Sequence, residues 1–196
     1  TLRKAPDDET DSVLLRAGIP PQGKYLCFAL RRWKGFEEKA PLFGAAAEYA
    51  YRTYGWTPVF VSVEKHLDPG AGQLAARGLT IPHYFLNDAG GAGTIIGALS
   101  RMQAVVSMRL HALIFAAGQG IPLAGVVYDP KVSAFLRYIG QEVFVDLADL
   151  TEQDLRSMID RCAAQAAHPE AQAAAVRNLQ AMEQKNVEVA RRLLNG

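Results

Sequence analysis

Two short stretches of the chain place charged side chains directly after apolar segments. In the first stretch, SMRLH, these residues are Arg109 and His111; in the second, YDPK, they are Asp129 and Lys131. Arginine binds carboxylate and phosphate oxygens, and histidine and aspartate can donate or accept a proton. These four residues are therefore the first candidates for binding and catalysis.

The first stretch resembles the start of a helix, with Ser107 as the N-cap residue. The N–H groups of Arg109, Leu110 and His111 would then lack helical partners and would favour an anion, as would the helix dipole. Two cationic side chains in a first turn are otherwise unfavourable, by about 0.3–1 kcal/mol each. The pattern predicts a phosphate or carboxylate ligand. The alternative is that Arg109 pairs with a carboxylate such as Asp129 and that His111 is a structural histidine.

Another arginine, Arg31, follows the first predicted strand, residues 24–30. In a doubly wound sheet this strand lies beside the strand that precedes Arg109. We therefore expect the two guanidinium groups to converge on one carboxylate or phosphate ligand. Its neighbour Arg32 is expected to be solvated surface, and Trp33 is either a lid or a packing residue.

The second stretch has two interpretations. As a functional residue, Asp129 would be a base or a positioning group for a substrate hydroxyl, and Lys131 would contact an anion. As a structural residue, Asp129 would be an N-cap followed by Pro130 at the first helical position, a common pairing that needs no ligand. Both interpretations remain open at this stage.

Strand and helix patterns alternate along the chain. Strands are expected at 24–30, 57–63, 80–86, 104–107, 121–128 and 142–147, and helices at 37–55 (from Pro41 onward), 68–77, 93–102, 109–119, 131–139 and 151–167. This alternation predicts an α/β fold with a doubly wound, Rossmann-like parallel sheet of about six strands. Ligands of such sheets bind outside the carboxyl ends of the strands.

Three segments are expected. Residues 1–23 are polar and are interpreted as a linker and inter-lobe segment, 24–168 as the Rossmann-like donor-binding domain, and 169–196 as a C-terminal helix that packs toward a missing N-terminal lobe. The chain opens on polar residues without an initiating Met, so we expect it to be a fragment of a larger protein.

Composition excludes several classes of function. The formal net charge is +1, which gives no support for nucleic-acid binding, and no apolar run is long enough to span a bilayer. The two cysteines, Cys27 and Cys162, lie in apolar patterns and are expected to be buried thiols. No Cys/His spacing suggests a metal site.

A glycine-rich segment, GGAGTIIG at 90–97, is similar to a dinucleotide-binding fingerprint. The fingerprint follows the first strand of its fold and needs an acidic residue about 20 positions later. Here the segment follows the third expected strand, and the next strand ends in Ser107 and Met108. We therefore do not expect a nicotinamide cofactor.

The pieces LRRW (30–33) and SMRLHALIFAAGQGIPLAGVVYDPKV (107–132), with the alternating elements between them, resemble the polysaccharide pyruvyl transferase family, in particular its CsaB-type members. The resemblance implies two Rossmann-like lobes arranged as in GT-B glycosyltransferases. This chain would be the C-terminal lobe, which holds the donor, and its partner would be its own N-terminal lobe.

The resemblance further implies the reaction. The donor substrate would be phosphoenolpyruvate, and the acceptor a cell-wall glycan or lipid-linked saccharide, which receives pyruvate as a ketal that anchors surface-layer proteins. No cofactor or metal is needed, and the protein would act in the cytoplasm, at the inner face of the membrane. The residues implied are His111 and Asp129 for catalysis, and Arg31, Ser107, Arg109, Leu110, His111 and Lys131 for substrate binding. This lobe alone should not turn over.

Two other functions remain open. One is the donor lobe of a nucleotide-sugar GT-B glycosyltransferase, which would use an acidic residue to bind a ribose. The other is a non-catalytic module that binds an anion and pairs with a partner lobe.

Overall fold

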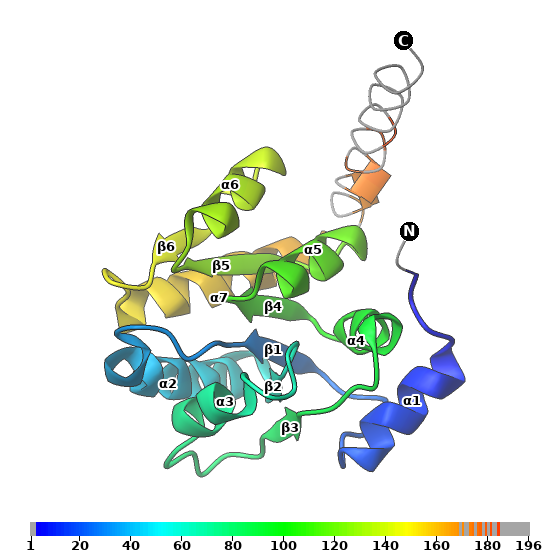
Figure 1. Ribbon diagram of the computed structural model, residues 1–196, viewed down its shortest axis with the longest axis horizontal. Helices are drawn as coiled ribbons and strands as arrows, with labels where there is room; N and C mark the ends of the chain where they lie inside the picture. Colours follow the sequence, from blue (N-terminus) through cyan, green and yellow to red (C-terminus); the bar gives the residue numbers. More distant parts are fainter. Residues whose placement is uncertain are drawn as a thin grey trace.

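A single parallel sheet forms the centre of the molecule, which is described here from a computed structural model (Figure 1). The structure describes residues 3–168 and, beyond them, residues 170, 173, 174, 176, 177, 179, 181 and 184. The strands are β1 (Tyr25–Ala29), β2 (Thr57–Val61), β3 (Tyr84–Leu86), β4 (Ala104–Ser107), β5 (Leu123–Val127) and β6 (Phe144–Asp146). Their order is β3-β2-β1-β4-β5-β6, which confirms the doubly wound prediction.

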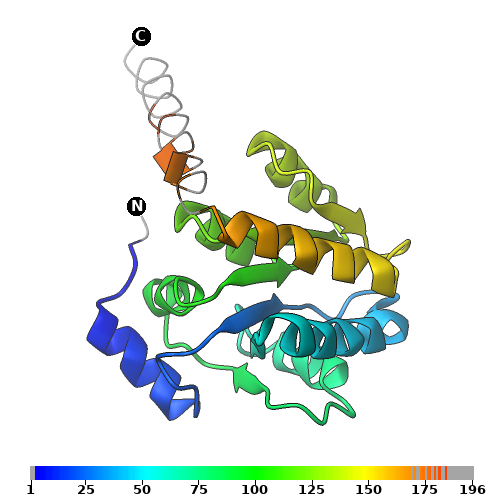
Figure 2. The ribbon, with the colours of Figure 1, turned by 180° about the vertical axis from the view of Figure 1, so that it is seen from behind.

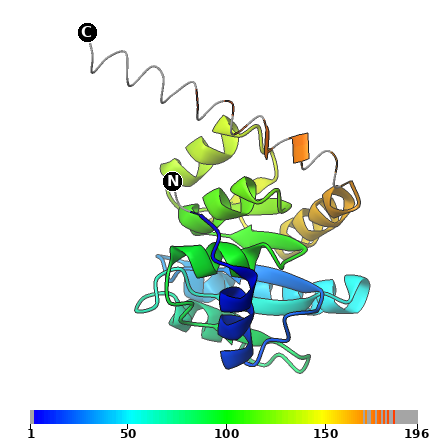
Figure 3. The same cartoon turned by 90° about the vertical axis from the view of Figure 1, so that its right-hand side faces the viewer.

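Helices cover both faces of the sheet, as Figures 2 and 3 show from behind and from the side. They are α1 (Asp7–Arg16), α2 (Phe36–Tyr54), α3 (Pro69–Ala75), α4 (Ala92–Leu99), α5 (Leu110–Gly118), α6 (Pro130–Tyr138) and α7 (Glu152–Ala166). α2 contacts α3 and α7 on one face, while α4 contacts α1 and α5 on the other. The central strands are therefore buried on both sides, which explains their continuous apolar sequence.

Strand β1 illustrates how the two cores are built. All five of its residues are buried. Leu26 and Phe28 belong to the core under α2 and α7, whereas Cys27 and Ala29 belong to the core under α4 and α5. Successive side chains point to opposite faces of a strand, so one strand supplies both cores.

The register of β1 and β4 sets up the carboxyl edge of the sheet. The two strands are parallel, with Ala29 paired to Ser107 at their ends. Arg31 and Arg109 each follow two residues later. The predicted neighbourhood of these two arginines at one edge is therefore confirmed.

The start of α2 corrects one prediction. The helix begins at Phe36 rather than at Pro41, and Pro41 lies inside it. Gly35 turns the chain with a φ of 82°, a left-handed conformation that glycine adopts without strain. Phe36 is then fully buried and fixes the first turn, so the early start is stabilised by packing despite the proline.

The N-terminal segment packs against the glycine-rich helix α4. Leu14 of α1 is fully buried, and the N–H of Ala5 donates to the carbonyl of Gly93 at 2.9 Å. A Cβ atom at Gly97 would collide with the Thr10 side chain. The glycines of α4 thus allow close packing of α1.

Further expectations concerned the two cysteines, the two terminal segments and membrane-spanning helices. Both cysteines are free and buried, as predicted, and burial raises the pKa of each thiol. The inter-lobe role of residues 1–23 stays a prediction. Most of the predicted helix at 169–196 lies outside the described residues. Within the described part of the chain, no helix has the length and apolar character needed to cross a bilayer.

Candidate functional site

Two pockets lie at the carboxyl edge of the sheet. The first, named here the Arg109 pocket, has a volume of about 450 Å³ and is lined by the loops after β2, β3 and β4, including Arg109, His111 and Phe115. The second, the Trp33 pocket, has a volume of about 720 Å³ and is lined by the loops after β1, β5 and β6, including Trp33 and Asp129. Of the predicted site residues, Arg109 and His111 line the first pocket and Asp129 lines the second.

Ser107 shapes the entrance to α5, but not as its N-cap. The N-cap is Arg109, and Ser107 is fully buried at the end of β4. Its hydroxyl accepts from the N–H of Arg109 at 2.8 Å and lies 3.2 Å from the carbonyl of Ala29, to which it can donate. The N-cap prediction is therefore wrong, because the strand continues to Ser107 and uses its hydroxyl to fix the turn beyond.

Arg109 forms an ion pair with a buried carboxylate that the sequence did not single out. Its Nε lies 3.3 Å from Oδ2 of Asp68, and their side chains are only 11% and 1% exposed. The alternative that Arg109 pairs with a carboxylate is therefore confirmed, but the carboxylate is Asp68 and not Asp129. The sequence pattern that singled out Asp129 could also have singled out Asp68, since each aspartate is followed by a proline at the start of a helix.

Asp68 connects two loops of the Arg109 pocket. Its Oδ2 also accepts from the N–H groups of Val63 at 3.1 Å and Glu64 at 2.8 Å, at the end of β2. Its Oδ1 is buried without a hydrogen-bond partner. Burial raises the pKa of Asp68, while the Glu64 N–H and the Arg109 guanidinium oppose that shift. The carboxylate thus holds Arg109 against the loop that follows β2.

His111 lies in the first turn of α5 and is exposed. It lines the Arg109 pocket together with Arg109, and its ring is 6.2 Å from that of Phe115. Leu110, the first residue of the helix, is half-buried against the core. An imidazole and the first N–H groups of α5 therefore face the same part of the edge, an arrangement that suits an anion.

Arg31 contacts two aromatic residues that line the Trp33 pocket. Its Nη1 donates to the hydroxyl of Tyr128 at 3.3 Å, and its guanidinium carbon is 5.3 Å from the centre of the Trp33 ring. Its charge is a minor influence on two carboxylates: it opposes the rise that burial causes in the pKa of Asp68, and it adds to the lowering of the Asp129 pKa by the Lys131 N–H. The guanidinium is therefore within electrostatic reach of both pockets, held by aromatic rings.

Asp129 and Lys131 begin α6 in the way the structural interpretation expected. Asp129 is the N-cap, its Oδ1 accepts from the N–H of Lys131 at 3.0 Å, and Pro130 is the first helical residue. The Lys131 Nζ lies 3.4 Å from Oδ2 of Asp129. The hydrogen bond from the Lys131 N–H lowers the pKa of Asp129, so the carboxylate is ionised near neutral pH.

The structure thus brings Arg109, Leu110 and His111 together and places Asp129 and Lys131 on a separate helix. Arg31 is the candidate that reaches both groups. Among the described residues, no cluster of three or more His, Cys, Asp or Glu side chains could hold a metal ion.

Comparison with known proteins gives a family and a fold. A model of the family described as "Polysaccharide pyruvyl transferase" matches residues 3–130, more than half of the chain. No curated protein matches.

Several solved structures share the fold at low sequence identity. E. coli ADP-heptose LPS heptosyltransferase II is 15% identical over 83% of this chain and 53% of its own, with a TM-score of 0.60. A family 9 glycosyl transferase from Veillonella parvula is 13% identical over 81% and 51%, also at 0.60. The glycosyltransferase VinC, in complex with dTDP, is 17% identical over 99% and 45%, at 0.58.

This chain spans about half the length of each of these structures. They establish its architecture as that of one Rossmann-like lobe of a GT-B glycosyltransferase fold. The match to the family model extends from Arg3 past the Arg109 pocket to the start of α6. The chain belongs to the polysaccharide pyruvyl transferase family.

Proposed function

We propose that this lobe binds phosphoenolpyruvate in a CsaB-type pyruvyl transferase and that the acceptor is a sugar of a cell-wall glycan or lipid-linked saccharide. The observation that carries the proposal is the placement of Arg31 and Arg109 at the ends of adjacent strands, with His111 in the turn beside them. Phosphoenolpyruvate carries a carboxylate and a phosphate, and two guanidinium groups suit both.

The proposed reaction balances without a cofactor. Two hydroxyl oxygens of the sugar form bonds to the central carbon of phosphoenolpyruvate, and the bond from that carbon to the phosphate oxygen breaks. One hydroxyl proton reaches the methylene carbon, which becomes a methyl group, and the other leaves with the phosphate. The products are a cyclic pyruvate ketal and inorganic phosphate.

The residues of the Arg109 pocket would act on the donor. Negative charge increases on the departing phosphate, where preorganised donors stabilise a transition state most effectively. We assign this stabilisation to Arg31, Arg109 and the first N–H groups of α5, including that of Leu110. His111, which is exposed beside them, would contact the phosphate and donate a proton. Buried Ser107 would act by fixing Arg109 rather than by touching the donor.

Asp129 and Lys131 would act on the acceptor side. The lowered pKa of Asp129 makes its carboxylate a weak base but a good hydrogen-bond acceptor for a sugar hydroxyl. We therefore assign it to positioning the hydroxyl more than to removing its proton. Lys131 would hold that carboxylate and provide positive charge at the edge of the site.

The rest of the machinery is also a proposal. An N-terminal lobe of the same protein would close over this edge and complete the acceptor site, and the enzyme would work in the cytoplasm at the membrane face. The ketal would give the polymer the charge that anchors surface-layer proteins.

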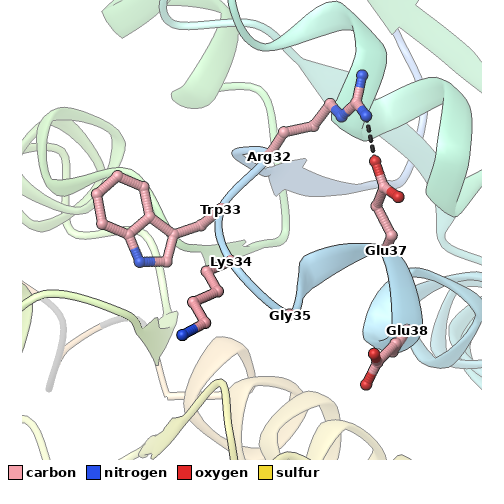
Figure 4. Close-up of a pocket in the computed structure, with 6 residues that line it drawn as sticks. All are labelled: Arg32, Trp33, Lys34, Gly35, Glu37 and Glu38. Atoms are coloured by element: carbon pink, nitrogen blue, oxygen red, sulfur yellow. Dashed lines mark hydrogen bonds and ion pairs between the residues drawn. The ribbon is translucent and has the colours of Figure 1, made fainter.

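Calorimetric titration of phosphoenolpyruvate into this chain tests the donor assignment, with inorganic phosphate and dTDP as comparisons. Saturable binding that prefers phosphoenolpyruvate, falls in Arg109→Lys and His111→Ala, and persists in Arg32→Ala supports it. Arg32 is a fair control because it pairs with Glu37 on the other side of its loop (Figure 4). Tighter binding of dTDP would instead favour a nucleotide-sugar transferase.

A further inference from the structure

The Trp33 pocket has a lining that the donor assignment leaves unexplained. It is formed by the loop after β1, the first turn of α2, the start of α6 and the segment after β6. An adjoining hollow of about 530 Å³ shares Trp33, Lys34, Gly35 and Glu38 with it. Figure 4 shows that the loop directs Trp33 to one side and the Arg32–Glu37 pair to the other.

Trp33 is exposed in a way that packing does not explain. Its exposed fraction is 46%, whereas the other tryptophan, Trp56, is 6% exposed. An indole gains more free energy from burial than most side chains, so exposure at a pocket wall is typical of binding surfaces. The ring centre of Tyr128 lies 5.0 Å from that of Trp33, and Arg31 contacts both rings. The indole is thus held in place by neighbours while much of its surface stays open.

The charges around Trp33 are balanced. Four carboxylates line the pocket, Glu38, Asp129, Asp146 and Asp149. Two lysines also line it, Lys34 and Lys39, and the cations of Arg31 and Lys131 lie beside Trp33 and Asp129. The Lys39 ammonium already donates to the carbonyl of Leu150 at 2.9 Å. Balanced charges give a phosphate no net attraction, whereas carboxylates accept hydrogen bonds from neutral hydroxyl groups. The pocket therefore suits an uncharged ligand with an apolar face and several hydroxyls.

A pyranose ring has this chemistry, since one of its faces presents C–H groups and its edge presents hydroxyls. We propose that the Trp33 pocket is a saccharide subsite, in which a sugar ring stacks on Trp33 and donates hydroxyl hydrogen bonds to Asp129, Asp146 and Asp149. Its identification as part of the acceptor site rests on the proposed function. The lobe that holds the donor would then also bind part of the acceptor.

Arg31 links this subsite to the donor site. Its guanidinium contacts Trp33 and Tyr128 and acts electrostatically on Asp68, the partner of Arg109. A sugar stacked on Trp33 would lie on one side of Arg31, and phosphoenolpyruvate at Arg109 on the other. The subsite is therefore next to the place where the acceptor hydroxyls are needed.

Nuclear magnetic resonance of the ¹⁵N-labelled chain tests the subsite, because its two tryptophans give two indole N–H signals. A neutral methyl hexopyranoside is titrated at millimolar concentrations. The expected result is a saturable shift of the Trp33 signal with no shift of the buried Trp56 signal. Trp33→Ala should weaken pyranoside binding at least about 10-fold. Because this variant has no Trp33 signal, its binding is measured from the backbone amide signals of α6. Trp33→Tyr should retain binding. Arg52→Ala, which removes an exposed ion pair with Glu48 on α2 and lines neither hollow, should bind like the unchanged chain.

Three results would overturn the subsite. These are a Trp33 signal that does not move, unchanged affinity in Trp33→Ala, and a Trp33 signal that saturates with less dTDP than pyranoside. Titration of phosphoenolpyruvate into a separate sample keeps the two proposals distinct. Failure of phosphoenolpyruvate with success of the pyranoside would overturn the donor assignment alone, and the reverse result would overturn the subsite alone.

Discussion

The Arg109 pocket and the Trp33 pocket are built from the same kind of junction, a buried strand that ends at the start of a helix. At the first, a charged side chain leaves β4 and pairs with a buried aspartate on a different element. At the second, the charged side chain after β5 caps its own helix. One junction is therefore fixed by a contact distant in sequence and the other by a local one. The comparison indicates that only the first depends on the whole fold.

The two junctions should differ most in the free energy of unfolding that is lost when the charged side chain of each is removed. Arg109→Ala leaves Asp68 buried without its cation and should lower the free energy of unfolding by about 3 kcal/mol. Asp129→Ala removes an N-cap from a partly exposed helix start and should cost about 1 kcal/mol. Denaturant unfolding of the two variants measures both values. Equal changes in the free energy of unfolding would mean that the Arg109–Asp68 ion pair contributes no more to stability than the Asp129 N-cap.

The serines of the two junctions offer a matched pair. Ser107→Ala removes a fully buried hydroxyl that accepts from the Arg109 N–H and should cost about 1–3 kcal/mol. Ser133→Ala removes a hydroxyl that donates to the carbonyl of Pro130 on the exposed side of α6 and should change stability by less than about 0.5 kcal/mol. Thermal unfolding compares them. A larger effect at Ser133 would contradict the difference in burial.

Ligand binding should separate the pockets in the same way. His111→Ala removes a donor beside Arg109 and should weaken phosphoenolpyruvate binding about 10-fold, or about 1.4 kcal/mol, with little change in stability because His111 is exposed. Trp33→Tyr should leave that affinity within about twofold, since Trp33 lies in the other pocket. Calorimetry of both variants provides the measurement. Equal losses would indicate a single shared site.

The smallest effects are the pH dependences, and their signs should be opposite. Burial raises the pKa of Asp68 above its ordinary 3.8, so the folded chain binds this proton more tightly than the unfolded chain. Relative to Asp68→Asn, stability should therefore decrease as pH rises from about 3.8 through the raised pKa.

The pKa of Asp129 is lowered below 3.8 by the Lys131 N–H. Relative to Asp129→Asn, stability should decrease as pH falls from about 3.8 through the lowered pKa. Unfolding measured from about pH 2 to 7, which extends below the ordinary pKa of both carboxylates, distinguishes the two directions. If stability relative to the Asn variant changed with pH in the same direction for both residues, one of the two carboxylates would have a different environment from the one described.

Local chemistry was sufficient to predict one junction but not the other. Asp129 followed by Pro130 is a helix start by residue type alone, and the structure confirms that interpretation. Ser107 also looked like an N-cap, yet hydrogen bonding to β1 keeps it in the strand and moves the cap to Arg109. Asp68 also precedes a proline at the start of a helix, but its pairing with Arg109 depends on the order of the strands.

The sequence by itself determined the alternation of strands and helices, the parallel sheet and the presence of Arg31 and Arg109 at one edge. These features follow from apolar periodicity and from the rule that parallel strands share a carboxyl edge. Only the tertiary structure decided which carboxylate holds Arg109, which pocket contains Asp129, and that Trp33 stays exposed beside Tyr128. The physical reason is that burial and long-range pairing depend on neighbours brought in by other elements, and local sequence does not encode them.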